Sequence, residues 1–343
     1  MEAVGIIANP ASGKDIRRLV AYGSVFDNHE KVNIVKRLLR AMNSIGVREV
    51  FFMPDYFGIG QRALEDIDVS LQVSFLDMAV TGTQIDSMQA AAMMSEMGIA
   101  LIVTLGGDGT NRVVAKSCGA TPLLPISTGT NNVFPFMVEG TLAGLAAGIA
   151  AMNSISLENM CQRTARLEIC RASKQVDIAL VDVVVSTSSF TATKAIWEIE
   201  TLKEIFLTRS VPGNIGFSSV GGLLCQLTPN SDKGLHVIIG PGEKKVMAPI
   251  APGLVHWLPI QSHRIVEFDK EIPLSPGPSV IALDGEREIT VNEGEAWSLR
   301  FSDRGPLVLD MDRVWQEVSA KSMFVADQFE KEVASGVEMP RKN

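Results

Sequence analysis

The stretch Gly106–Thr110, with the sequence Gly-Gly-Asp-Gly-Thr, most constrains how this chain can fold. An apolar run at 99–103 precedes it and is typical of a strand buried on both faces of a sheet, while residues 111–116 after it indicate a helix. Glycines on such a strand-to-helix turn let the backbone approach a ligand closely. The N-terminus of the following helix presents N–H groups that suit phosphate. The stretch therefore predicts a phosphate-binding loop.

Asp108 is the unusual residue of this stretch, because a carboxylate repels phosphate. It makes chemical sense if it holds a metal ion, or if it takes a proton from an attacking hydroxyl group. The alternative interpretation is a tight turn in which Asp108 only caps the helix. The complete pattern, placed directly after an apolar run, favours the functional interpretation.

Residues 9–14, Asn-Pro-Ala-Ser-Gly-Lys, form a second polar loop directly after an apolar run at 4–8. They are not a Walker A loop, because that motif would need a glycine at Ala8. The hydroxyl of Ser12 and the loop amides can donate hydrogen bonds to phosphate, and Lys14 supplies positive charge. The alternative is an ordinary β-turn with proline at its second position.

Residues 127–132, Ser-Thr-Gly-Thr-Asn-Asn, form a third polar loop after a predicted strand at 122–126. Their hydroxyl and amide groups can line a nucleotide pocket. The alternative is an N-cap before the helix predicted over 142–151. We favour a binding role, because this is the third such loop at the end of a buried strand.

Strands and helices alternate through the first part of the chain. This alternation predicts an α/β domain with a doubly wound parallel sheet, in which ligands bind at the carboxyl ends of the strands. The predicted strands are 4–8, 49–53, 73–76, 99–103 and 122–126, and the predicted helices are 28–46, 84–97, 111–116 and 142–151.

Beyond residue 154 the pattern changes to short β-rich runs separated by Gly, Pro, Asn and Asp, which predicts an all-β second domain, a sandwich. The runs are 166–170, 176–187, 223–227, 235–239, 264–268, 279–283 and 296–301. Residues 314–333 return to helical spacing, and we expect this helix to pack on the first domain. The predicted first domain comprises residues 1–154 and the C-terminal part 308–343, and the predicted second domain comprises residues 155–307.

Composition narrows the class of partner. The chain has 343 residues and a formal net charge of -8, which argues against nucleic acid. Its four cysteines show no metal-like spacing and suggest a reducing compartment, so we expect a cytoplasmic protein. The longest apolar tract, 142–152, is too short to span a bilayer, so no membrane partner is expected. We also expect a homo-oligomer.

All three loops resemble motifs of one superfamily, which joins the NAD kinases with the diacylglycerol and sphingosine kinases. Residues 106–110 resemble its Gly-Gly-Asp-Gly-Thr signature, and residues 9–13 resemble its first Asn-Pro-x-Ser-Gly loop. Residues 128–132 resemble the Gly-Thr-x-Asn-Asp element of the lipid kinases, with Asn132 where the acidic residue usually stands. The closest resemblance is to the NAD-kinase-like branch that includes the acetoin-catabolism X proteins.

This resemblance implies an NAD-kinase-like α/β domain followed by a β-sandwich, and ATP-dependent phosphoryl transfer to the 2′-hydroxyl of the NAD adenosine ribose. The small-molecule partners would be ATP and NAD. Asp108 would be catalytic; the metal ligands stay open, with Mg²⁺ near Asp108 as one option. The residues implied to bind ATP phosphates are Asn9, Ser12, Gly13, Lys14, Gly106, Gly107, Gly109, Thr110, Thr128, Gly129, Thr130 and Asn131. The residues implied to bind the acceptor are Asn132, Asp182, Asp284 and Glu286.

Two of the acceptor residues have structural alternatives. Asp182 stands inside an apolar run and looks like the family's Asn-Glu/Asp element, with Val181 in place of the Asn, but a strand end or a structural ion pair would also explain it. Residues 284–286 look like the family's Asp-Gly-Glu turn, and Asp-Gly is also the commonest hairpin signal.

Two rival functions stay open at this point. Residues 128–132 favour a kinase of a lipid or small polyol hydroxyl. The departures from the NAD-kinase acceptor motifs favour a non-catalytic nucleotide-binding accessory protein of acetoin catabolism.

Overall fold

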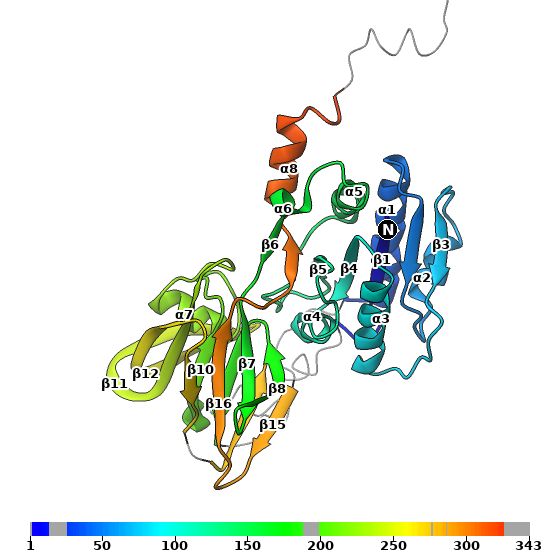
Figure 1. Ribbon diagram of the computed structural model, residues 1–343. Coiled ribbons are helices and arrows are strands. Elements are labelled where there is room, and N and C mark those ends of the chain that lie inside the picture. Colours follow the sequence, from blue (N-terminus) through cyan, green and yellow to red (C-terminus); the bar gives the residue numbers. More distant parts are fainter. Residues whose placement is uncertain (1, 14–25, 188–198, 276, 286, 326–343) are drawn as a thin grey trace, which may run out of the picture.

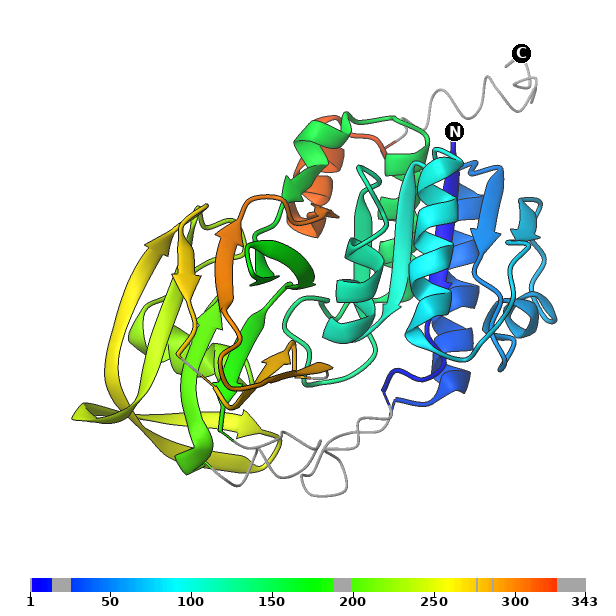
Figure 2. The same ribbon diagram turned by 60° about the horizontal axis from the view of Figure 1, so that its bottom comes forward.

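The computed structural model describes residues 2–13, 26–187, 199–275, 277–285 and 287–325. It contains an α/β part with a parallel sheet and a β-rich part beside it (Figures 1 and 2). None of the helices within these described ranges is long and apolar enough to cross a membrane.

A seven-stranded sheet forms the centre of the α/β part, in the order β3-β2-β1-β4-β5-β17-β6. All neighbouring pairs are parallel except β17 and β6. The strands are β1 (Ala3–Ala8), β2 (Glu49–Phe52), β3 (Gln72–Phe75), β4 (Leu101–Gly106), β5 (Leu123–Ser127), β6 (Cys161–Arg163) and β17 (Leu307–Leu309). The predicted doubly wound parallel sheet is confirmed. Its strand order reverses between β1 and β4, which is the place where such sheets bind ligands.

Helices cover both faces of this sheet, and the strand residues alternate accordingly. Val4 and Ile6 of β1 pack on one face with α1, α2, α5 and α8, whereas Ala3 and Ile7 pack on the other face with α3 and α4. The helices are α1 (Asn28–Ser44), α2 (Ile59–Leu64), α3 (Gln84–Glu96), α4 (Asp108–Ala115), α5 (Gly140–Ala151), α6 (Leu157–Met160) and α8 (Met311–Ala320). Because both faces are covered, the strands are apolar runs without strict alternation of polar residues.

The chain enters the β-rich part from β6 and returns through β17, which pairs with both β5 and β6. Helix α8 follows, and its Val314 and Val318 join the apolar cluster of α1 and α5 (Figure 1). The helix predicted over 314–333 thus begins at Met311 and ends at Ala320. The rest of that prediction, from residue 326 onward, lies outside the described residues. The division of the chain at residues 154 and 307 stays a prediction.

Two antiparallel sheets build the β-rich part, and the predicted all-β character is confirmed. The larger sheet has the order β12-β11-β10-β9-β14-β15 and the smaller one β13-β16-β7-β8. Their facing sides share one apolar cluster, in which Leu167 and Phe301 of the smaller sheet meet Val183 and Phe206 of the larger. The strands are β7 (Arg166–Arg171), β8 (Lys174–Ala179), β9 (Asp182–Ser186), β10 (Leu202–Leu207), β11 (Lys233–Ala251), β12 (Leu254–Glu267), β13 (Glu271–Pro273), β14 (Ser279–Leu283), β15 (Arg287–Val291) and β16 (Trp297–Ser302).

Two β-run predictions were wrong. Residues 176–187 are not one run but two strands, β8 and β9, because the Asp284 side chain accepts the amides of Leu180, Val181 and Asp182 where the chain breaks. Residues 223–227 do not form a strand either: helix α7 (Phe217–Leu224) occupies their first part. Its Gly221 lies directly against the Leu207 side chain, so the absence of a Cβ lets this helix pack closely on β10.

Candidate functional site

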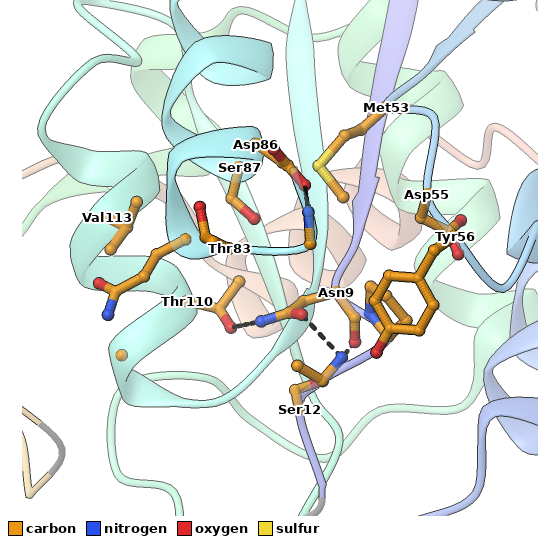
Figure 3. A pocket seen from close by; sticks show the side chains of 15 residues that line it. Asn9, Ser12, Met53, Asp55, Tyr56, Thr83, Asp86, Ser87, Thr110 and Val113 are labelled. Carbon is orange, nitrogen blue, oxygen red and sulfur yellow. Dashed lines mark hydrogen bonds between the residues drawn. The ribbon is translucent and has the colours of Figure 1, made fainter. Parts of the chain in front are cut away.

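The three predicted loops meet at the carboxyl ends of β1, β4 and β5. Asn9, which follows β1, donates from Nδ2 to the Thr110 hydroxyl in the first turn of α4 at 2.9 Å. Ser12 and Thr128 share a hydrogen bond between their hydroxyl groups, also at 2.9 Å. The first loop is therefore bonded directly to both of the others. Figure 3 shows the Asn9–Thr110 bond.

Glycine is required where these loops approach one another most closely. A Cβ added to Gly107 would lie 2.8 Å from Oδ1 of Asn132. Gly13 adopts φ +74°, and a Cβ there would lie 2.8 Å from the carbonyl oxygen of Thr128. A side chain at Gly13 would thus push the backbones of two loops apart, and one at Gly107 would displace the Asn132 side chain.

The other predicted residues of the third loop hold its shape. Asn132 donates from Nδ2 to the Ser127 hydroxyl at 2.8 Å and to the Gly129 carbonyl at 3.3 Å. Thr130 is exposed, and its hydroxyl donates to the side chain of Asn131 at 3.2 Å. Binding roles for these residues stay predictions.

Lys31 is a functional candidate that the sequence reasoning missed. Its side chain is fully buried, and its ammonium group donates to the carbonyls of Asn9 at 2.8 Å and Ser12 at 2.7 Å, and to Oδ1 of Asn28 at 2.9 Å. A buried ammonium needs such partners. The available signal was its position in the apolar stripe of α1, four residues before Val35. Lys31 therefore holds the first loop in place through two of its backbone carbonyls.

A pocket of about 210 Å³ opens between the first loop and the N-terminal turns of α3 and α4 (Figure 3). Its lining is Asn9, Pro10, Ala11, Ser12, Met53, Asp55, Tyr56, Gly82, Thr83, Gln84, Asp86, Ser87, Gly109, Thr110 and Val113. The residues after β2 and those before α3 were not predicted. The pocket is smaller than the roughly 300–1,000 Å³ of sites that enclose a drug-sized ligand. It therefore suits one part of a nucleotide, with the remainder lying along the sheet edge.

Both carboxylates of the pocket already support loops. Asp55 accepts the amides of Phe57 and Gly58, each at 2.9 Å. Burial raises the pKa of Asp55, an effect that its backbone hydrogen bonds and Lys31 partly offset. Burial would also raise the pKa of Asp86, but hydrogen bonds from Thr81 and Gly82 outweigh it and lower that pKa below its usual range.

The lining described above contains no lysine or arginine. Hydroxyl and carboxylate groups dominate its polar atoms, and these groups recognise the hydroxyls of a sugar more readily than a phosphate. The pocket is thus better suited to a ribose than to a phosphate group.

Asp108 points away from this pocket, toward the chain that follows the third loop. Its Oδ1 accepts the amide of Phe134 at 2.7 Å and that of Val133 at 3.0 Å. The N-cap position of α4 is taken by Gly107, which makes no side-chain cap. Asp108 is therefore not the cap of its own helix. The two amides hold its carboxylate in one orientation at the seam between the α/β and β-rich parts.

Asp284 belongs to the β-rich part and is buried. It adopts φ 48° and Gly285 φ 67°, so the Asp-Gly pair forms the tight turn between β14 and β15 that hairpin chemistry predicts. Its Oδ1 accepts the amide of Val181 at 2.8 Å. Nε of Arg112 lies 3.7 Å from its Oδ2, close enough for an ion pair but not for a hydrogen bond. Burial raises the pKa of Asp284 despite Arg112 and these amides.

The structure brings the predicted acceptor residue Asp182 next to Asp284. Asp182 is buried at the start of β9, and its carbonyl accepts the amide of Asp284 at 3.1 Å. Glu286 and the phosphate-loop residue Lys14 lie outside the described residues. Acceptor binding by Asp182, Asp284 and Glu286 stays a prediction.

Arg209 was also missed. It lies two residues after the end of β10 and is 5% exposed, with its guanidinium carbon 4.7 Å from the centre of the Phe134 ring. The sequence signal was the one used for the other loops, a polar residue at the end of a buried strand.

A metal site built from protein side chains alone is not supported. No group of three or more His, Cys, Asp or Glu residues within the described ranges is arranged to hold a metal ion. Magnesium is usually held by one or two carboxylates together with substrate phosphates. The motif carboxylate is that of Asp108, and a role for it near Mg²⁺ stays a prediction.

Comparisons with known proteins agree with the two-part architecture. The sequence matches the family ATP-NAD kinase N-terminal domain over residues 4–152 and the family Acetoin catabolism protein X C-terminal domain over residues 165–304. It is 37% identical over 322 residues to acetoin catabolism protein X of Cupriavidus necator, covering 90% of each chain.

Two solved structures resemble the fold. One is a yeast NADH kinase in complex with NADH, with a TM-score of 0.49 and 14% identity, covering 95% of this chain and 88% of that one. The other is an NAD kinase from Archaeoglobus fulgidus in complex with ATP, with a TM-score of 0.45 and 12% identity, covering 94% of this chain and 100% of that one.

Proposed function

The chain belongs to the acetoin catabolism protein X family, and from that membership we propose that it is an ATP-dependent phosphotransferase of the NAD kinase type. The proposed acceptor is the 2′-hydroxyl of the adenosine ribose of NAD, so that the product is NADP. The match to the ATP-NAD kinase N-terminal domain supports a kinase-type fold and spans all three loops of the site.

One observation carries the proposal: Gly106–Thr110 opens α4 at the point where the strand order reverses, and Asn9 ties it to the first loop. A helix N-terminus beside flexible glycines is suited to phosphate. The neighbouring pocket offers hydroxyl and carboxylate groups suited to a ribose. The phosphate part of a nucleotide thus matches the start of α4, and the ribose part matches the pocket beside it at the same sheet edge.

In the proposed reaction, the acceptor hydroxyl oxygen forms a bond to the γ-phosphorus of ATP, the bond to the ADP oxygen breaks, and the hydroxyl proton passes to Asp108. Phosphoryl transfer depends mainly on positioning and on electrostatic stabilisation. The amides of Val133 and Phe134 would position the carboxylate of Asp108 for proton transfer. Bound Mg²⁺ would neutralise charge on the phosphates.

The test is phosphoryl transfer from γ-labelled ATP to a panel of acceptors by the purified chain. The panel comprises NAD, NADH, glycerol and vesicles that contain diacylglycerol. Labelled NADP is the expected product. Labelled lipid or glycerol phosphate without NADP would replace NAD as the acceptor but keep the phosphotransferase.

A non-catalytic accessory protein of acetoin catabolism is the second candidate. The name of the Cupriavidus necator relative and the engagement of Asp284 by three consecutive amides favour it. ATP binding without turnover on any acceptor would support this candidate and exclude the kinase.

A further inference from the structure

The backbone around Arg209 is fixed by side chains on both sides. The Thr208 hydroxyl donates to the carbonyl of Leu180 at 2.6 Å, and the Ser218 hydroxyl donates to the carbonyl of Arg209 itself at 3.0 Å. The Ser210 hydroxyl donates to the carbonyl of Cys225 at 2.7 Å. Arg209 therefore leaves the end of β10 in a defined direction.

The side chain of Arg209 crosses from the β-rich part to the α/β part, where its guanidinium lies over Phe134. Phe134 is also the residue whose amide binds Asp108. Arg209 and the motif carboxylate thus both contact Phe134, Arg209 through the ring and Asp108 through the backbone amide.

Two donors of Arg209 lack acceptors. Nε and Nη2 are buried, and within the described part of the chain neither has a hydrogen-bond partner. These two atoms form one edge of the guanidinium, the edge that presents parallel N–H groups to a carboxylate or phosphate. Buried donors without acceptors are costly, so an unfilled edge of this kind needs an explanation.

The group remains a cation at neutral pH. Burial lowers the pKa of Arg209 to about 10, although Asp108 and Asp284 oppose the shift. Both carboxylates influence it, yet neither forms an ion pair with it among those found between described residues.

Other cations near the motif already have partners. Lys31 donates to the first loop, and Arg112 lies in a buried ion pair with Asp177. Lys116, one turn further along the chain from Arg112, also pairs with Asp177, at 2.5 Å. Nε of Arg112 also lacks a hydrogen-bond acceptor, but it faces Asp284 at 3.7 Å. Among these cations and within the described residues, only Arg209 has two such donors and no paired carboxylate.

We propose that Arg209 binds a phosphate group of the nucleotide, through Nε and Nη2, at the seam beside Asp108. This inference rests on the proposed function for the identity of the ligand. Both donors are buried, so the phosphate reaches them when the α/β and β-rich parts move apart at Phe134, and domain motion of this kind is common across such seams.

The test compares Arg209→Met and Arg209→Lys with the parent chain. The control is Arg171→Met, because Arg171 also lies over an aromatic ring, that of Trp297, but is exposed and remote from the motif. Titration calorimetry with ATP and with inorganic pyrophosphate measures affinity, and urea unfolding without ligand measures stability.

Arg209→Met should weaken binding of ATP and pyrophosphate by about 10- to 100-fold, the effect of losing charge-assisted hydrogen bonds. Its unfolding midpoint without ligand should not fall, because the substitution removes a buried cation without an acceptor. Arg209→Lys keeps the charge but not the paired donors and should bind with intermediate affinity; it also serves as the test if Arg209→Met does not fold. Arg171→Met should leave both affinities unchanged.

Unchanged affinity for ATP and pyrophosphate in Arg209→Met, or absence of pyrophosphate binding by the parent chain, would overturn the inference. Turnover on NAD with unchanged affinities would refute the inference and keep the proposed function. Conversely, Arg209-dependent pyrophosphate binding without turnover would keep the inference and remove the kinase.

Discussion

Arg112 of α4 and Asp177 of β8 form an ion pair, with 3.2 Å between Nη1 and Oδ1, and only 1% and 3% of their side chains are exposed. Asp177 also pairs with Nε of Arg287 at 2.8 Å. Helix α4 begins at the Gly-Gly-Asp-Gly-Thr motif, so this pair fixes the motif helix to the β-rich part of the chain. The orientation of Asp108 relative to residues of the second part depends on it.

Replacing Asp177 with Asn should destabilise the protein by about 3–5 kcal/mol, because the buried Arg112 loses the carboxylate to which it is hydrogen-bonded and keeps only Asp284, at 3.7 Å. Urea unfolding measures the change. The control is Glu267→Gln, since the Lys270–Glu267 pair is exposed, and its midpoint should not move. Equal midpoints for Asp177→Asn and the parent chain would show that the pair does not hold the two parts together.

The Arg112–Asp177 ion pair also predicts how the stability of the protein depends on pH. Burial would raise the pKa of Asp177, but Lys116, the Ile178 amide and Arg112 outweigh it and lower that pKa. A depressed carboxyl pKa contributes stability above its unfolded value of about 3.9, and the contribution is lost as pH falls through the folded value. The stability difference between the parent chain and Asp177→Asn should therefore be constant near neutral pH and shrink below about pH 4.

The contribution of Asp284 to stability changes with pH in the opposite direction to that of Asp177. The pH dependence of Asp177 must therefore be measured as a difference between the parent chain and the Asp177→Asn variant. The raised pKa of Asp284 means that its contribution declines as pH rises above about 3.9. Subtracting the Asp177→Asn curve removes terms that both proteins share. If the stability difference between the parent chain and Asp177→Asn stays constant from pH 6 to pH 2, Asp177 is not the source of the predicted pH dependence.

Lys31→Met should loosen the first loop, because the carbonyls of Asn9 and Ser12 would lose a buried donor. We expect a loss of about 1–3 kcal/mol in unfolding free energy and weaker ATP binding. Lys36→Met on the same helix is the matched control, since Lys36 pairs with the exposed Asp66. Calorimetry measures the ATP affinity of each variant, and urea unfolding measures its free energy of unfolding. If Lys31→Met and Lys36→Met have similar affinities and stabilities, Lys31 does not organise the loop.

The main features of the α/β part could be predicted because their signals are local. Each of β1, β4 and β5 is a short apolar run followed by a loop with its own turn chemistry, and Asp27 caps α1 just before the predicted helix. The meeting of three loops at one sheet edge follows from the direction of parallel strands. The bonds between loops, such as Ser12 to Thr128, could not be derived, because they depend on side-chain geometry across 116 residues of sequence.

The missed residues depend on distant parts of the chain. The local signals of Arg209, at a strand end, and of Lys31, in an apolar helix stripe, are weak. The contacts that make the two residues functional candidates are with Phe134 and with the carbonyls of the first loop. The break between β8 and β9 arises because Asp284, more than 100 residues away, accepts the amides there. Local sequence patterns do not contain this long-range contact, so they predict residues 176–187 as one strand.

Gly107→Ala should disturb the third loop, because the new Cβ would lie 2.8 Å from Oδ1 of Asn132. Overpacking of this kind costs about 1–3 kcal/mol. Asn132→Ala in the same chain should recover most of that loss, which a double-mutant cycle in urea measures directly. Gly213→Ala is the control, since a Cβ there meets no atom within 4 Å. Additive effects of the two substitutions would rule out the contact.

Asp108→Asn should lower turnover by about 10²–10⁴-fold, the usual contribution of a positioned general base. An amide side chain presents one acceptor oxygen and cannot take the acceptor proton, but its oxygen can still accept the Phe134 amide, so ATP affinity should change little. Labelled-phosphate turnover and calorimetry with ATP separate the two effects, with the exposed Asp68→Asn as control. Parent-level turnover would refute the catalytic role. Loss of ATP affinity equal to the loss of turnover would instead assign Asp108 to loop architecture.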